Sequence, residues 1–136
     1  MANLLNVRHA LFEHLDALVL TPTLPIAWPE AEAFTPPGDG RYLEASLVFN
    51  APRFEALTDG LLDQGQLVVN VVWPRNQGDA DVLAVAQTVR DHFITDPLLS
   101  LFHGGTKVKI SGQPWISSLK SETSAVRVPV TVPWTA

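Results

Sequence analysis

Apolar side chains recur at every second position in three segments of this chain, 41–50, 66–74 and 126–132. This spacing is typical of β-strands that turn one face toward a core. Segment 66–74 is largely apolar on both faces, which predicts a central strand, and with 41–50 it is expected to form a long antiparallel hairpin. Pro129 and Pro133 interrupt the N–H groups of the third segment. We therefore predict an edge strand there, or a strand with one free row of N–H groups.

Two other segments have the three- and four-residue spacing of amphipathic helices. The first is capped by Asn3 and is predicted to end near Leu20. The second begins at Asp79 or Asp81 and is expected to stop before Pro97. The apolar stripes are Leu4, Val7, Leu11, Leu15 and Leu18 in the first helix, and Val82, Val85, Ala86, Val89 and Phe93 in the second.

The remaining segments are shorter and more interrupted. They are predicted to be a short strand (25–28), a Pro- and Gly-rich loop (29–40), an apolar connector (98–102), an exposed or edge strand (107–110) and another short strand (113–119). The predicted order is α-β-β-β-α-β-β, with an eighth element, a further β-strand, if 113–119 forms one. This order favours an α+β fold in a single domain, 1–136, with a mostly antiparallel β-sheet packed against two α-helices.

The composition of the chain argues against several classes of function. The formal net charge of −5 argues against general nucleic-acid binding and against a polybasic membrane anchor. The chain has no cysteine, which excludes disulfides, Cys-ligated metals and Cys nucleophiles. No apolar run reaches membrane-span length, and no signal peptide is recognisable, so we expect a soluble cytoplasmic protein. Charged residues make up only 17% of the chain, below the usual ~25%, which suggests that other subunits cover part of the surface.

The motifs that could carry chemistry are weak. His9 and Glu13 are one helical turn apart and could hold a metal ion, but a solvated ion pair is the favoured interpretation. His92 suits a helix C-terminus, where a cation is stabilised. The S-x-x-K match at 117–120 and the Gly-rich segment 104–107 lack the context of a catalytic serine or a phosphate loop. We expect no enzyme activity, no cofactor and no metal site.

Aromatic residues are more informative. Trp28, Phe34, Trp73, Trp115 and Trp134 lie at predicted strand ends or in loops, mostly beside proline. They are interpreted either as ordinary core or as anchors of a protein–protein contact, where Trp, Tyr and Arg concentrate. The candidate subunit or tube interface consists of Trp28, Phe34, Arg41, Tyr42, Trp73 and Arg75.

Nearly the whole chain, roughly 3–133, resembles the phage tail terminator-like proteins of tailed phages and prophages. Five features carry the resemblance, and they follow one another in a fixed order. They are the N-terminal helix leading into IAWP (26–29), the loop FTPP (34–37) entering YLE (42–44), the strand GQLVVNVVWP (65–74) with its NQG turn (76–78) and helix, the arm 104–110, and the closing VRVPVTV (126–132).

The resemblance implies a structural role. Such proteins form a ring, usually of six subunits, that caps the tail tube at its set length and presents a surface to the head connector. It implies three kinds of protein partner, namely further copies of the chain, the tail tube protein and a head connector or completion protein. DNA would pass through the lumen without specific binding, and acidic walls would avoid trapping it. The expected location is the tail of the virion, after assembly in the host cytoplasm, with no membrane partner.

Two other interpretations stay open. Another head–tail connector or completion protein would have a similar small α+β architecture. A small enzyme or ligand-binding α+β domain is the less favoured alternative, because it would need a pocket with converging polar groups.

Overall fold

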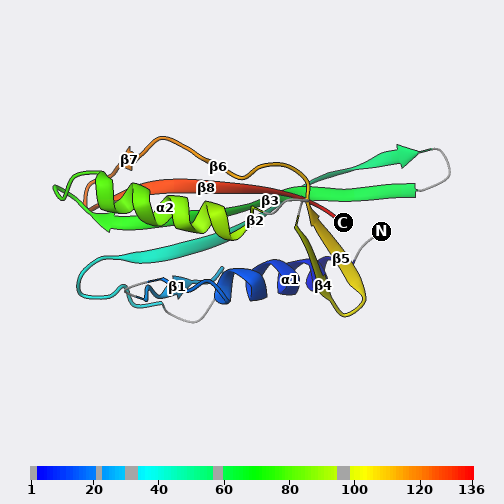
Figure 1. Cartoon of the computed structure of the whole chain (residues 1–136), viewed down its shortest axis with the longest axis horizontal. Coiled ribbons are helices and arrows are strands. Elements are labelled where there is room, and N and C mark those ends of the chain that lie inside the picture. The colour runs from blue at the N-terminus through cyan, green and yellow to red at the C-terminus, as the bar shows by residue number, and fades with distance from the viewer. Residues whose placement is uncertain (1–2, 21–22, 30–33, 57–59, 95–98) are drawn as a thin grey trace.

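A computed structural model of the chain describes residues 3–20, 23–29, 34–56, 60–94 and 99–136 (Figure 1). These residues form two helices and one mostly antiparallel sheet, which confirms the α+β class. The elements are α1 (Leu4–Asp16), β1 (Ile26–Ala27), β2 (Tyr42–Ala56), β3 (Gly60–Pro74), α2 (Ala80–His92), β4 (Ser100–His103), β5 (Thr106–Ile110), β6 (Trp115–Ile116), β7 (Lys120–Ser121) and β8 (Ala125–Thr135).

The order of elements matches the prediction only loosely, because the second half of the chain holds more strands than its pattern indicates. The segment predicted as an apolar connector contains β4, and 113–119 forms only the two-residue strand β6. Strand β7 was not predicted at all. These short strands are stabilised by the partner they pair with, so periodicity within four or fewer residues does not reveal them.

The sheet runs in the order β1-β2-β3-β8-β5-β4, and β6 and β7 also pair with β8. All pairs are antiparallel except β1 with β2. β3 lies between β2 and β8, as predicted for a central strand. Of the two alternatives predicted for 107–110, the edge strand is wrong, because β4 pairs with β5 and itself forms the edge, whereas the exposed strand is confirmed by the exposed side chains of Lys107 and Lys109.

The prediction that the last strand lies at an edge is also wrong. One side of β8 pairs with β3 along almost its full length, and the other side pairs in turn with β7, β6 and β5. The carbonyls of Pro129 and Pro133 accept hydrogen bonds from the N–H groups of Ser117 and Ser111, at 2.9 and 3.0 Å. The backbone of both prolines therefore faces the side of short strands, where a missing N–H group interrupts little of the ladder.

The predicted β2–β3 hairpin is present and is longer than its sequence pattern. Its ladder continues from Asn50 opposite Gln64 to Ala56 opposite Gly60, and the register shifts between Asn50 and Arg53. Pro52 falls within this irregularity, where an unpaired backbone position tolerates proline. The outer part of the hairpin projects beyond the other strands (Figure 1).

Both helices and the sheet share one core. α1 packs on β4 and β5, and α2 packs on β3, β8 and β6 (Figure 1). Fully buried members include Val7, Leu11 and Leu15 of α1, Val82, Ala86 and Val89 of α2, Leu67, Val69 and Val71 of β3, and Val128, Val130 and Val132 of β8. The alternation of these strand residues leaves a second set of side chains on the opposite face of the sheet.

The helix boundaries differ slightly from expectation. Asn3 caps α1 as predicted, and its Oδ1 accepts from the N–H groups of Leu5 and Asn6. α1 ends at Asp16, four residues before Leu20. Asp79 occupies the N-cap position of α2, but its side chain makes no capping hydrogen bond. Pro97, the predicted stop of the second helix, lies outside the described residues.

Candidate functional site

The candidate interface residues gather mainly where β2 begins and β3 ends. The guanidinium of Arg41 lies over the ring of Trp73, 4.7 Å from its centroid, and Arg41 Nη2 donates to Gln77 Oε1 at 2.8 Å. Trp73 itself is only 5% exposed and belongs to the core. Arg41 therefore covers a core indole and presents its own edge at the surface, as arginine does when its planar cation stacks on an aromatic ring.

The other candidates take three different positions. The ring of Phe34 lies 5.1 Å from that of Tyr42, so the loop before β2 is anchored on the first residue of the strand. Trp28 instead contacts Phe12 of α1, with ring centroids 5.0 Å apart. Arg75 is exposed, and its Nη1 donates to the carbonyl of Thr123 at 3.4 Å. The structure thus brings together Arg41 with Trp73 and Phe34 with Tyr42.

A second surface, the outer sheet face, was not predicted as a site. It consists of side chains opposite the core on β2, β3 and β8, namely Tyr42, Glu44, Ser46, Val48 and Asn50, Gln64, Gln66, Val68 and Asn70, and Arg127, Pro133 and Thr135; Val72, Pro129 and Thr131 lie on the same face but are buried. Only Glu44 and Arg127 among them are charged. This face of the sheet is therefore nearly neutral, and it contributes to the low proportion of charged residues in the chain.

Glu44 and Arg127 neutralise each other across β3. Arg127 Nη1 lies 2.7 Å from Glu44 Oε1, and Arg127 Nε lies 2.8 Å from Glu122 Oε1. Asn70, on the strand between them, donates to Glu44 Oε1 at 3.4 Å. Partial burial opposes the charge of Arg127, but the hydrogen bond and negative charge of Glu44 outweigh it, so the pKa of Arg127 is raised. The alternation of side chains along the three strands predicts that Glu44, Asn70 and Arg127 share one face of the sheet. Only the register of the strands shows that these residues contact one another.

Several large apolar side chains are exposed. They include Phe102 of β4, Trp115 of β6, Phe49 and Val48 of β2, and Leu4, Leu5 and Val19. Phe102 is 67% exposed on the edge strand of the sheet. Trp134, by contrast, is fully buried. The five aromatic residues singled out in the sequence therefore do not form one surface, since Trp73 and Trp134 are buried and Trp115 is exposed.

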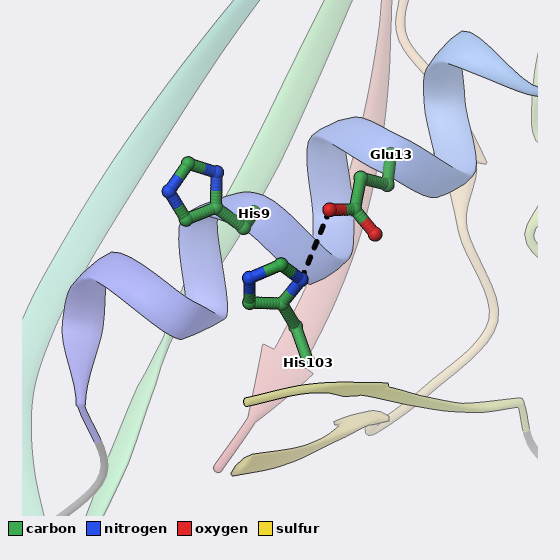
Figure 2. Close-up of side chains that lie close together, drawn as sticks. All are labelled: His9, Glu13 and His103. Atoms are coloured by element: carbon green, nitrogen blue, oxygen red, sulfur yellow. Dashed lines mark ion pairs between the residues drawn. The ribbon is translucent and has the colours of Figure 1, made fainter. Parts of the chain in front are cut away.

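The structure shows where the weak chemical motifs of the sequence lie. Ser117 and Lys120 lie in the β6–β7 region and not on a helix, so the S-x-x-K geometry is not formed. Gly104 and Gly105 form the predicted turn, between β4 and β5, with φ of 55° and 81°. Glu13 forms its ion pair with His103, at 2.9 Å, and not with His9 (Figure 2). His92 ends α2 as predicted and also contacts His14 of α1.

A hollow of about 200 Å³ lies between the segment after α1 and α2. It is lined by Val19, Leu20, Leu24, Trp73, Ala84, Val85 and Thr88, none of which is ionisable. This lining does not provide the converging charged groups that acid–base catalysis uses. In the described part of the chain, neither helix has the length and apolar character needed to cross a bilayer.

Comparison with known proteins identifies the chain. The family model described as "Phage tail terminator protein" matches residues 6–134. A solved structure superposes on the chain with a TM-score of 0.76 at 28% sequence identity, covering 95% of this chain and 92% of that chain, and it carries no functional name. A search of curated proteins gives no match. With its sequence matched almost from end to end, the chain belongs to the phage tail terminator family.

Proposed function

We propose that this protein assembles into a ring, of six subunits as is usual for such proteins, that caps the tail tube and ends its polymerisation. The observation that carries the proposal is the family match over residues 6–134. The capped end would then form the joining surface for the head connector. No covalent chemistry is required, because the contribution of each subunit is its shape and charge.

A closed ring requires each subunit to contact its two neighbours through two different patches. The outer sheet face, which includes the candidate residue Tyr42, and the adjoining candidates Arg41 and Arg75 supply one patch. The exposed edge of β4, with Phe102, supplies the second patch. It lies at the opposite end of the sheet from β1. An edge strand and an exposed aromatic side chain favour association with another chain.

The charge balance supports a conduit for DNA. At a formal charge of −5 on each chain, an assembled ring would repel phosphates and let the genome pass without specific contacts. The protein would in this way be a component of the virion tail.

Electron microscopy of phage particles made without the protein tests the role. The proposal predicts tail tubes of uncontrolled, excessive length. Tails of normal length that do not join to heads would instead assign the protein to head–tail connection and overturn the capping role. Complementation with the wild-type chain should restore tube length in the same preparation.

A further inference from the structure

We propose that His9, Glu13 and His103 form a binding site for one divalent transition metal ion, with Zn²⁺ as the best-suited ion. The proposal is independent of the capping role. Each residue offers a ligand atom, and these atoms all lie within 4.8 Å of one another. Figure 2 shows Glu13 and His103 pointing toward each other, with the His9 ring beside them on α1.

The donor set suits zinc. Two imidazole nitrogens and one carboxylate oxygen, with a position left for water, form a recurrent three-residue zinc site. Imidazole also binds other late transition metals, whereas Ca²⁺ requires six or more oxygen ligands, which this cluster does not supply. The chemistry of the cluster therefore selects a transition metal over a hard cation.

The distances require only small movements of the side chains. Zn–ligand bonds of about 2.0–2.2 Å at tetrahedral angles place neighbouring donor atoms roughly 3.4 Å apart. His103 Nδ1 and Glu13 Oε1 are 2.9 Å apart, and the His9 and His103 ring centroids are 4.9 Å apart. Glu13 is 61% exposed and His103 is 33% exposed, so an ion can enter from solvent and the carboxylate can turn to meet it.

The scaffold fixes where the three residues stand. His9 and Glu13 are one turn apart on α1, and Asn6, one turn before His9, holds the hairpin against the same side of the helix. Asn6 Nδ2 donates to the carbonyl of Gly104 and to Thr106 Oγ1, at 3.3 and 3.2 Å. A Cβ at Gly104 would lie 2.8 Å from Asn6 Nδ2, so the glycine lets the turn that carries His103 approach α1 closely.

A bound ion would cross-link α1 to the β4–β5 hairpin, and two consequences follow. First, zinc should raise the melting temperature, because it binds the folded chain and the unfolded chain does not hold the three ligands together. Second, the cross-link should make α1 and the β4–β5 hairpin unfold together, so that the zinc-bound protein still melts in a single transition.

Equilibrium dialysis of the tag-free protein against Zn²⁺, with bound metal counted by mass spectrometry, tests the site. We expect one ion per chain and no comparable binding of Ca²⁺. Substitution of one ligand, Glu13→Gln or His103→Asn, should weaken zinc binding at least tenfold, since even residues that only support ligands are worth about 10–100-fold. Co²⁺ should give the intense visible absorption of a four-coordinate site.

His14→Gln is the matched control, because it removes a histidine from the same helix outside the cluster. It should keep the stoichiometry and affinity of the wild type. Circular dichroism checks that each variant is folded, and Glu13→Gln, a near-isosteric change at an exposed side chain, decides the outcome if His103→Asn does not fold. Zinc binding that is absent in the wild type, unchanged in Glu13→Gln, or lost in folded His14→Gln would overturn the proposal.

Discussion

The indole of Trp134 on β8 packs directly against Gly65 of β3. A Cβ at residue 65 would lie 2.7 Å from Trp134 Cζ2 and 2.0 Å from the backbone oxygen of Val48. Gly65 thus leaves room for the largest fully buried side chain of the protein, at the point where β2, β3 and β8 lie side by side.

Gly65→Ala should therefore destabilise the fold by about 1–3 kcal/mol, the range measured for overpacked cores. The conflict involves backbone as well as a side chain, so relaxation of one rotamer cannot relieve it. Urea unfolding followed by tryptophan fluorescence measures the change. Gly112→Ala is the control, because its Cβ would make an ordinary 3.5 Å contact with Pro133. Equal midpoints for the two variants would contradict this account of Gly65.

The stacked histidines His14 and His92 should make stability depend on pH. Each Nε2–H donates to the other residue's backbone carbonyl, and the ring centroids are 4.0 Å apart. Burial lowers the pKa of His14 and the nearby His92 adds to the lowering, against the opposing hydrogen bond to the His92 carbonyl. The unfolded chain then binds the proton more readily, so the contribution of His14 is complete above about pH 6.5 and is lost as pH falls through its lowered folded-state pKa.

His14→Gln should remove that part of the pH dependence, since the amide can still donate to the His92 carbonyl but does not titrate. The measurement is the unfolding free energy of both proteins between pH 8 and pH 5. We expect the difference between them to change with pH in the acidic range. Parallel curves throughout would show that His14 does not contribute.

The Glu44–Arg127 pair should couple β2 to β8 by about 1 kcal/mol at low salt, near the upper end for partly exposed pairs. A double-mutant cycle with Glu44→Gln and Arg127→Met measures the coupling, and added salt should reduce it. The pair formed by Arg90 and Asp91, neighbours on α2 with 3.2 Å between Nη2 and Oδ1, provides the comparison. Its coupling should be smaller, and a result in the reverse order would contradict the claim that the Glu44–Arg127 pair helps to hold β2 and β8 together.

Arg75→Glu should weaken ring assembly without unfolding the subunit, because Arg75 is exposed at the candidate interface. Sedimentation velocity at increasing concentration should show less oligomer for the variant than for the wild type. The free energy of unfolding of the subunit should change by no more than about 0.5 kcal/mol. Gln87→Glu introduces the same side chain at an exposed position of α2 and should assemble normally. Equal loss of assembly in both variants would point to net charge and not to this surface.

Much of the fold could be predicted from periodicity, and the exceptions have a common cause. The alternation around Leu67 and Val69 and the helical spacing around Leu11 and Val89 identify the core because each is repeated over several turns or residues. The strands β4, β6 and β7 have no such repetition, and their pairing partners lie elsewhere in the chain. The interior place of β8 depends on which of its sides Pro129 and Pro133 face, a property of register and not of composition.

The sites show the same division. Sequence spacing brought His9 and Glu13 together on one helix face, but it gave no reason to include His103, which lies 90 residues further along. The sequence leaves Trp73 open between core and interface anchor, and the structure places it in the core. Arg41, selected with it, covers that indole from the surface. Contacts between distant segments decide these assignments, and a single sequence does not contain them in readable form.

Capping of a growing tube tests the central claim most directly. Tail tube protein would be polymerised in the presence and absence of this protein, challenged with fresh tube subunits and imaged by cryo-electron microscopy. The account predicts a ring of density at one end of each treated tube and no further growth from that end. Continued growth at both ends of tubes that carry no added density would contradict it.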